Sequence, residues 1–357
     1  MKNILKIFIL FTIPTIGFSQ ENLTVEDAIS YALKHNYDIQ ISTNSVEQAK
    51  NNKSLYNSGY LPSLTASGNG NYSNNNTILT SQAGVENEIT GAETKAYGGS
   101  IGINYILFNG GSRKYNYNKL KQLYSQSDIN RKIQIENTLL DVYTSYYNVA
   151  RNQEQKKTIE DAYKISTERL ERVIAQQKYG KKTKLDVLNA KVDANSDSLN
   201  LLNITVLLQN NSRNLNYLLG REINKEFSTN MEVHLDPFLD YRILSEQLKN
   251  NNSNLKLIKI NQEISKQELK INQAGWLPSI SASASYGVNN NDNGPAGFFA
   301  TQQSNGINAG INLSWNLFDG GTTKVRVQNA KINLKTQELN NQKLHLNLEN
   351  QLAQFWA

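Results

Sequence analysis

The chain contains three histidines, His35, His234 and His345, and histidine is the side chain that most often serves metal binding and proton transfer. The three are isolated in the sequence, no cysteine accompanies them, and no pair shows the spacing of a metal site. No glycine-rich phosphate loop or nucleophile motif occurs elsewhere. The sequence therefore predicts a protein without enzymatic activity, cofactor or metal.

The charged residues do not form a catalytic or nucleic-acid-binding pattern either. Asp and Glu fall mostly on the surfaces of expected helices, where they are solvated. The formal net charge of +6 is spread along the chain, and no basic cluster alternates with stacking aromatic residues. We therefore expect no nucleic-acid partner, and the function has to come from the helices and strands that the chain forms.

Residues 1–20 have the pattern of a secretory signal peptide. Lys2 and Lys6 give a positive start, an apolar run follows, and small or polar residues close the segment at Ser19 and Gln20. A membrane anchor is the alternative, but the apolar run is too short to span the hydrocarbon core. We therefore expect an exported protein.

Two motifs occur twice, in the same order and at nearly the same separation. Segment 60–64 (YLPSL) recurs as 276–280 (WLPSI), and segment 104–111 (NYILFNGG) recurs as 314–321 (SWNLFDGG). The glycine pair that ends the longer motif fits a strand-to-helix turn better than a phosphate cradle. Such a duplication predicts two copies of one structural unit.

We place the first copy at residues 21–220 and the second at 238–357, with a linker at 221–237. Each copy is expected to contain a helix, a strand pair and a long helix. This organisation puts two strand pairs in one chain.

Apolar and small polar residues alternate with period two in both strand pairs. We expect strands at about 63–73 and 97–109 in the first copy, and at about 279–289 and 306–318 in the second. Such alternation is typical of transmembrane barrel strands, whose apolar side faces lipid. The residues expected to face lipid are Ile101, Ile103, Tyr105, Leu107, Ile311, Leu313, Trp315 and Leu317.

A half-buried sheet of a soluble protein also alternates. Two features favour lipid: the polar face carries small uncharged residues, and aromatic residues such as Tyr60, Trp276 and Tyr286 bracket the segments, as in interfacial girdles. Segments 73–96 and 289–305, rich in Asn, Gly, Thr and Gln, are expected to be surface loops.

Long helices follow the first strand pair. Residues 112–178 contain neither glycine nor proline and would form a helix about 100 Å long. A second helix is expected over about 185–219, with Gly220 as its stop. The segment 179–183 then forms the tip of a helical hairpin. The apolar residues that follow heptad steps in the second helix, and that we expect in a packed core, are Leu185, Leu188, Val192, Leu199, Leu202 and Val206.

Four strands are too few to close a barrel, because the smallest transmembrane barrels have about eight strands and open edges are not satisfied in lipid. Copies related by cyclic symmetry would complete it. Helices of about 100 Å exceed the bilayer thickness and must project into an aqueous space. We therefore expect an α+β membrane protein with four transmembrane strands per chain in a shared barrel and coiled-coil hairpins that form a duct.

The chain resembles the TolC-type outer-membrane efflux proteins. The matching segments are 23–29, 32–36, 59–64, 107–111, 179–190 and 217–220. The resemblance implies a homotrimer in the outer membrane with a periplasmic helical tunnel, serving a tripartite efflux or type I secretion system. It implies passive conduction, with a periplasmic adaptor (membrane fusion) protein and an inner-membrane pump as partners. It assigns the adaptor contact to the hairpin tip, at Tyr179, Gly180, Lys181, Lys182, Thr183 and Leu185.

The second copy lacks counterparts of about residues 148–220. We therefore expect a C-terminally incomplete repeat, a tunnel wall without its second hairpin, and no unaided transport. The alternative function is an exported coiled-coil structural or adhesin protein with a barrel anchor. That alternative explains export, strands and heptads but leaves the duplication unexplained. The sequence does not indicate the exported substrate or the pump class.

Overall fold

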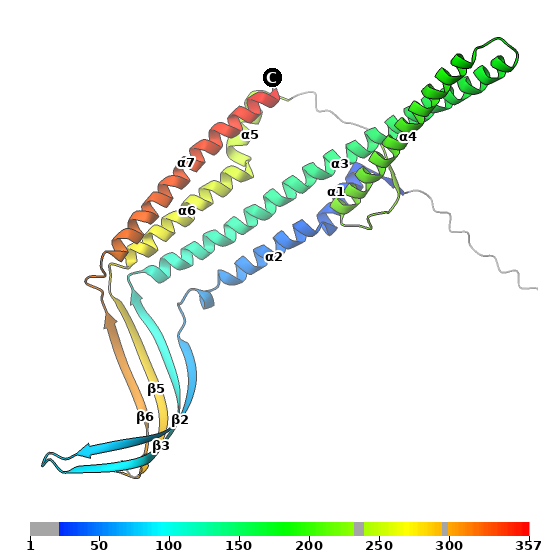
Figure 1. The fold of residues 1–357 in the computed structure, drawn as a ribbon. Coiled ribbons are helices and arrows are strands. Elements are labelled where there is room, and N and C mark those ends of the chain that lie inside the picture. The colour runs from blue at the N-terminus through cyan, green and yellow to red at the C-terminus, as the bar shows by residue number, and fades with distance from the viewer. Residues whose placement is uncertain (1–20, 232–238, 295–298, 357) are drawn as a thin grey trace, which may run out of the picture. The chain divides into compact units, whose positions relative to one another are not determined.

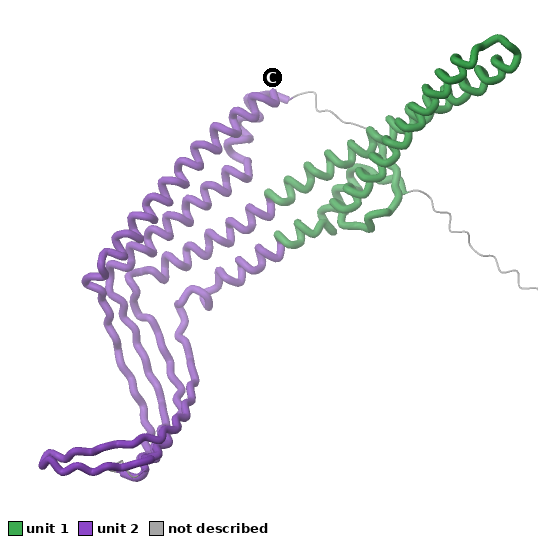
Figure 2. The backbone as a smooth tube through the Cα atoms, viewed as in Figure 1, with its two compact units in different colours: residues 1–42, 133–238 green, residues 43–132, 239–357 purple. Residues whose placement is uncertain are grey.

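The computed structural model describes residues 21–231, 239–294 and 299–356. The expected signal peptide, His234 and part of the expected linker lie outside these residues. The chain divides into two compact units, residues 1–42 with 133–238 and residues 43–132 with 239–357 (Figure 2). Within the described residues, no helix is long and apolar enough to cross a membrane.

A four-stranded antiparallel sheet forms one part of the second unit. Its strands are β2 (Ser63–Thr80), β3 (Glu86–Asn109), β5 (Ser279–Asp292) and β6 (Thr301–Ser314), in the spatial order β2-β3-β5-β6. The two strand pairs of the repeat therefore meet at β3 and β5 and lie side by side (Figure 1). β2 and β6 are the two edges, and neither has a second strand partner within the described chain.

The first strand pair is longer than the sequence indicated. The segment expected as loop 73–96 continues both strands as a two-stranded ribbon, and only a short turn at 81–85 joins them. Gly84 has a positive φ of 80°, and its N–H donates to the Ser81 carbonyl across 2.9 Å. In the second pair the strands likewise extend to Asp292 and from Thr301. Polar Asn- and Thr-rich runs obscured these strands, because they lack the period-two alternation of apolar residues by which the other parts were found.

Helices continue from the strands in both copies. In the second unit α6 (Ser253–Ala274) precedes β5 and α7 (Thr322–Trp356) follows β6, while α5 (Tyr241–Asn251) stands before α6. In the first copy α2 (Tyr37–Asn52) and a short 3-10 helix η1 (Leu55–Asn57) precede β2. The helix α3 (Ser112–Lys178) follows β3 as one element of 67 residues.

The first unit contains α1 (Val25–His35), α4 (Lys184–Leu219) and the part of α3 from residue 133 onward. A short parallel sheet joins β1 (Glu21–Leu23) to β4 (Phe227–Thr229). The β4 strand lies in the segment expected as a linker, so residues 227–229 are part of a folded unit. The core of this unit comprises Leu23, Ala28, Ala32, Val142, Tyr146, Val149, Leu215, Leu219 and Phe227.

Asn36 separates α1 from α2 and fixes the end of α4. Its side-chain oxygen accepts N–H bonds from Asp38 at 2.9 Å and Ile39 at 3.1 Å. Its side-chain nitrogen donates to the Leu218 carbonyl across 2.8 Å. Gly220 ends α4 in the left-handed conformation, as expected, so close to α1 that an added Cβ would lie 2.3 Å from the His35 carbonyl oxygen. Only glycine fits that position.

Candidate functional site

Cross-strand register gives the sheet an apolar face. Directly opposite residues of neighbouring strands share one face. One row joins Leu64, Ile103, Ala284 and Ala309. The rows on either side are Ala66–Ile101–Tyr286–Ile307 and Tyr105–Ala282–Ile311. These side chains are largely exposed in the single chain, with Ile311 at 75%.

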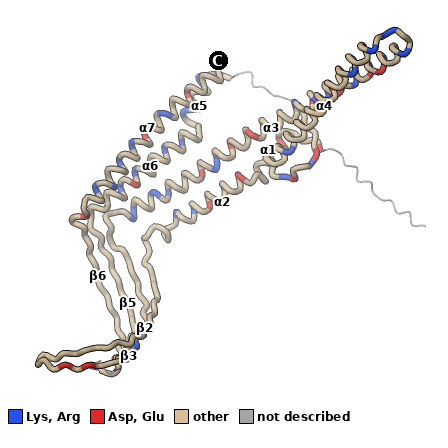
Figure 3. The backbone as a smooth tube through the Cα atoms, viewed as in Figure 1, with Lys and Arg blue, Asp and Glu red and all other residues tan. Residues whose placement is uncertain are grey.

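The opposite face is polar, small and uncharged. Its rows are Ser63–Asn104–Ser283–Gly310, Thr65–Gly102–Ser285–Asn308 and Ser67–Ser100–Gly287–Gly306. The hydroxyls of Ser67 and Ser100 are hydrogen-bonded across the strands at 2.9 Å. The four-stranded part has no charged residue from Ala96 to Asn109, and Figure 3 shows the charges of the chain concentrated on the helices. A membrane-spanning sheet that lines an aqueous lumen has this distribution.

Five of the eight residues expected to face lipid lie on the apolar face as members of a strand. They are Ile101, Ile103, Tyr105, Ile311 and Leu313. The other three residues, Leu107, Trp315 and Leu317, are not members of the apolar rows.

A bulge interrupts the alternation at Leu107. Ile106 is opposite Ser281 and Phe108 is opposite Ile280, so Leu107 has no partner on β5. Phe108 therefore continues the apolar row in place of Leu107, because one extra residue reverses the alternation. Trp315 and Leu317 follow Ser314, the last residue of β6, in the segment that leads to α7, and both side chains are exposed.

Arg113 holds this bulge in place. Its guanidinium donates hydrogen bonds to the carbonyls of Ile106 and Leu107, the latter across 3.3 Å, and to that of Gly59 across 3.4 Å. The sequence alone does not point to this arginine, because its role depends on the carbonyls of a bulge that only the pairing of β3 with β5 defines. The first turn of α3 is thereby tied to the end of β3.

The hairpin tip places the expected adaptor-contact residues together between α3 and α4. Gly180 has a φ of 73°, its N–H donates to the Gln177 carbonyl, and the Lys181 N–H donates to that of Gln176. These two bonds close the end of α3. Tyr179 and Leu185 are exposed, at 83% and 65%. The tip thus exposes an aromatic ring, an aliphatic side chain and basic residues.

Thr183 and Asp186 begin α4 with a capping box. The Thr183 hydroxyl accepts the Asp186 N–H at 3.2 Å, and the Thr183 N–H donates to the Asp186 carboxylate at 2.9 Å. The Thr183 N–H and hydroxyl bonds, together with nearby Lys182, hold the pKa of Asp186 below its ordinary value. The carboxylate therefore remains charged and keeps the tip turn ordered at neutral pH.

The heptad stripe of α4 is not part of the core of the single chain. Leu185, Leu188, Val192, Leu199, Leu202 and Val206 are all exposed, from 47% to 65%. The residues that α4 buries are instead Ala190, Ala194, Ile204, Leu215, Asn216 and Leu219. The expectation of core packing was wrong for these residues, because α4 buries a different set of side chains within the single chain. The stripe remains available to helices outside this chain.

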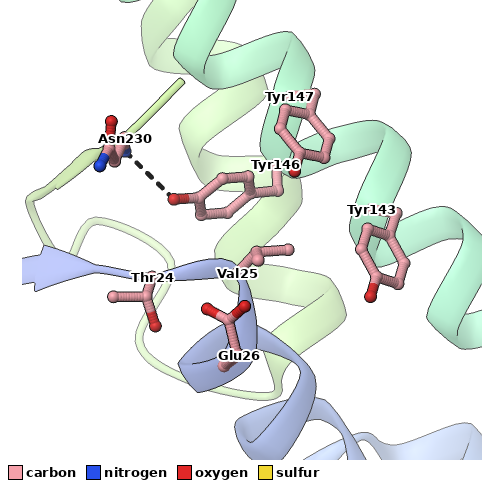
Figure 4. Close-up of a pocket in the computed structure, with 7 residues that line it drawn as sticks. All are labelled: Thr24, Val25, Glu26, Tyr143, Tyr146, Tyr147 and Asn230. Atoms are coloured by element: carbon pink, nitrogen blue, oxygen red, sulfur yellow. Dashed lines mark hydrogen bonds between the residues drawn. The ribbon is translucent and has the colours of Figure 1, made fainter. Parts of the chain in front are cut away.

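A pocket of about 250 Å³ lies beside Tyr146 in the first unit, lined by Thr24, Val25, Glu26, Tyr143, Tyr146, Tyr147 and Asn230 (Figure 4). The Tyr146 hydroxyl donates to the Leu23 carbonyl at 2.9 Å and accepts the Asn230 N–H at 3.1 Å. Burial raises the pKa of Tyr146, so the phenol stays protonated. The Tyr146 hydroxyl therefore links β1 to the segment after β4, and it offers no base or nucleophile.

Two of the three histidines lie within the described residues. His35 ends α1 and His345 lies in the middle of α7. No group of three His, Cys, Asp or Glu side chains in the described ranges could hold a metal ion. The geometry combines a sheet that has one apolar and one small polar face with long helices that expose an apolar stripe, and this combination is typical of a membrane channel component.

The comparison with protein families agrees with this class. Residues 28–221 and 244–357 match the outer membrane efflux protein family, in two parts that correspond to the two copies of the repeat. The chain belongs to the outer membrane efflux protein family, the TolC family. It is an outer-membrane channel protein with helices in the periplasm, and it is a transport protein, not an enzyme.

Solved structures confirm the fold. The CmeC outer membrane channel of Campylobacter jejuni is 17% identical, with a TM-score of 0.73 over 90% of this chain and 68% of that one. The outer membrane protein VceC of Vibrio cholerae is 16% identical, with a TM-score of 0.68 over 92% and 77%. The open-state MtrE channel of Neisseria gonorrhoeae is 17% identical, with a TM-score of 0.66 over 92% and 72%. No curated protein sequence matches the chain.

Proposed function

We propose that three copies of this chain form one barrel and one helical tunnel that passively conducts substrates through the periplasm and outer membrane. An inner-membrane pump and a periplasmic adaptor would supply the substrate, as in a tripartite efflux or type I secretion system. The main support for this proposal is the sheet, which has an apolar face, a face of small polar residues and two open edges, β2 and β6.

The open edges support assembly with sister copies. In lipid, each unpaired backbone N–H and C=O costs several kcal/mol, so an open four-stranded sheet is not a stable membrane structure. Pairing of β6 from one copy with β2 of the next closes the ring without a further element. The exposed stripe of α4 supports the same assembly, because an apolar heptad seam needs a neighbouring helix to cover it.

The hairpin tip supports an adaptor contact. Lys178, Lys181, Lys182 and Lys184 surround the turn and only Asp186 opposes them, so the tip carries a positive charge. Exposed Tyr179 adds an aromatic side chain of the kind that anchors protein interfaces. The proposed contact residues are therefore Tyr179, Gly180, Lys181, Lys182, Thr183 and Leu185.

Site-specific crosslinking tests the adaptor contact. A photoreactive amino acid at position 179, in cells that express the chain with its adaptor, should yield a crosslink to the adaptor. The matched control carries the same amino acid at Tyr143, which is also exposed but lies far along α3 from the tip. Absence of the Tyr179 crosslink in cells with active efflux would contradict the proposal.

Assembly is tested separately. A cysteine at Ser67 of β2, combined in turn with a cysteine at each polar-face position of β6 (Gln302, Ser304, Gly306, Asn308, Gly310 and Asn312), should form disulfide-linked dimers and trimers in membranes for the combination that the shear of the closed barrel brings together. The single variants are the controls and should remain monomeric on denaturing gels. A monomeric, water-soluble product would contradict the shared barrel.

A further inference from the structure

The helix that follows each strand pair begins with basic residues. The first four turns of α3 contain Arg113, Lys114, Lys119 and Lys121 and no Asp or Glu. The corresponding part of α7 contains Lys324, Arg326, Lys331 and Lys335, also without Asp or Glu. Figure 3 shows this concentration of basic residues near the starts of both helices. Cations at this end of a helix oppose its dipole, so helix stability does not account for them.

Two lysines in each stretch are related by the internal repeat. Lys114 and Lys324 occupy equivalent positions of the two copies, and so do Lys121 and Lys331. Within each helix the two lysines are seven residues apart and therefore share a face. All four are exposed, and none forms an ion pair with a carboxylate of the described residues. We call these four residues the basic belt.

Carboxylates on the adjoining elements already have other partners. Glu268 of α6 forms an ion pair with Lys119, which is not a member of the basic belt. Asp319 accepts the N–H groups of Thr323 at 2.9 Å and Gly321 at 3.1 Å. The positive charge of the belt is therefore not compensated within these parts of the chain.

Ring contacts connect the belt to the apolar face of the sheet. The Arg113 guanidinium lies 5.6 Å from the ring centre of Tyr105, a member of that face, and 4.7 Å from that of Tyr60. The rings of Tyr60 and Tyr117 meet edge to face, with centroids 6.1 Å apart. The Lys121 ammonium then lies 4.3 Å from the ring centre of Tyr117. Tyrosines and cations thus begin where the apolar face ends.

We propose that Lys114, Lys121, Lys324 and Lys331 bind the anionic headgroups of phospholipids in the leaflet at the helical end of the barrel. Tyrosine rings prefer the interface between hydrocarbon and water, and lysines just beyond it attract lipid phosphates. The acyl chains of such a lipid would lie against the apolar face. This inference rests on the proposed membrane-spanning barrel and adds the headgroup chemistry that the barrel selects.

Lipid retention measures this selectivity. The full chain is assembled in bilayers of equal parts phosphatidylglycerol and phosphatidylethanolamine with identical acyl chains, purified in mild detergent, and its retained lipid quantified by mass spectrometry. The wild-type chain should retain phosphatidylglycerol preferentially. The variant K114Q/K121Q/K324Q/K331Q should lose this preference by about fivefold or more. The matched control K34Q/K157Q/K164Q/K191Q removes the same charge from other exposed lysines and should retain lipid as the wild type does.

The outcomes separate the inference from the proposed function. Unchanged phosphatidylglycerol retention in the variant that lacks the four belt lysines would overturn the inference. A change in the ion selectivity of the channel without a change in lipid retention would overturn it too, because the belt lysines of the wild type would then face the lumen. Failure of the wild-type chain to float with the bilayers would instead overturn the barrel. The smaller variant K114Q/K121Q guards against misfolding and should lose about half of the preference, since it removes one of two equivalent pairs.

Discussion

The apolar face of the sheet can be tested by adding one charge to either side of the same strand. Ile103 and Asn104 are neighbours in β3, which is paired on both sides, but they belong to opposite faces. We therefore compare Ile103→Arg with Asn104→Arg. Both variants add the same side chain and charge at the same level of the sheet.

The expected magnitude follows from the position of Ile103. Its row, with Leu64, Ala284 and Ala309, lies between the Tyr286 row and the Ala282 row, and so in the middle of the apolar face. An arginine at the bilayer midplane costs about 2–4 kcal/mol per chain on the lipid face. This corresponds to roughly 30-fold to several hundred-fold in the folding equilibrium. Asn104→Arg faces small polar residues, where an aqueous lumen solvates the guanidinium, and should cost much less.

Two assays read out the difference. Heat-resistant oligomer on semi-native gels reports assembly in membranes, and urea titration of the chain refolded into lipid vesicles gives the free energy of unfolding. Ile103→Arg should reduce the oligomer severely, whereas Asn104→Arg should assemble with an altered single-channel conductance. The variant Ile103→Leu controls for disturbed packing and should behave as the wild type.

The assignment of Ile103 to a lipid-facing row would be refuted if Asn104→Arg disturbed assembly as much as Ile103→Arg does. It would also be refuted if the wild-type chain were recovered as a water-soluble monomer. In that case Ile103 would pack in an ordinary interior, and the alternation would be that of a soluble half-buried sheet.

Three further predictions concern the first unit. Tyr146→Phe removes the hydroxyl that donates to the buried Leu23 carbonyl and accepts the partly buried Asn230 N–H. It should lower the free energy of unfolding by about 1–3 kcal/mol, measured by urea denaturation, whereas Tyr143→Phe should have little effect. Gly220→Ala should destabilise the folded chain far more than Gly180→Ala. Both glycines have positive φ, but an added Cβ meets a carbonyl oxygen at Gly220 and open space at Gly180. Thermal unfolding followed by circular dichroism compares the two variants, and equal effects would contradict the close approach of Gly220 to α1. The lowered pKa of Asp186 means that its stabilisation of the α4 start is fully present above the unfolded value of about 3.9 and is lost as the pH falls through the lower folded value. The protection of the tip amides against hydrogen exchange, taken relative to the intrinsic exchange rate at each pH, should therefore decrease in acid, and Asp186→Asn should remove that dependence.

Local sequence chemistry predicted the elements and their order. The glycine-free run predicted α3, which the structure confirms as one helix, and Gly180 and Gly220 marked turns that require positive φ. The two motif pairs predicted the duplication that the family match reproduces. These features were accessible because each depends on residues close together in the chain.

Surface exposure was harder to predict from the sequence. The apolar stripe of α4 suggested a core seam, yet these residues are exposed in the single chain, and α4 buries other side chains, such as Ala190, Ile204 and Leu215, instead. A heptad pattern shows that a helix needs a partner but does not show whether that partner belongs to the same chain. The same limit applies to the strands, whose alternation identifies two faces without naming what covers them.

Taken alone, the sequence determined the repeat, the alternating strands, the hairpin with its glycine turn and the absence of catalytic motifs, because periodicity, glycine positions and short motifs are local properties of the chain. Only the tertiary structure placed β3 beside β5, freed Leu107 in a bulge held by Arg113, and set the Tyr146 hydroxyl between Leu23 and Asn230. It also connected the basic start of α3 to the apolar face through Tyr60 and Tyr117. Those contacts join residues far apart in the chain, and their partners depend on register and packing, which no local pattern specifies.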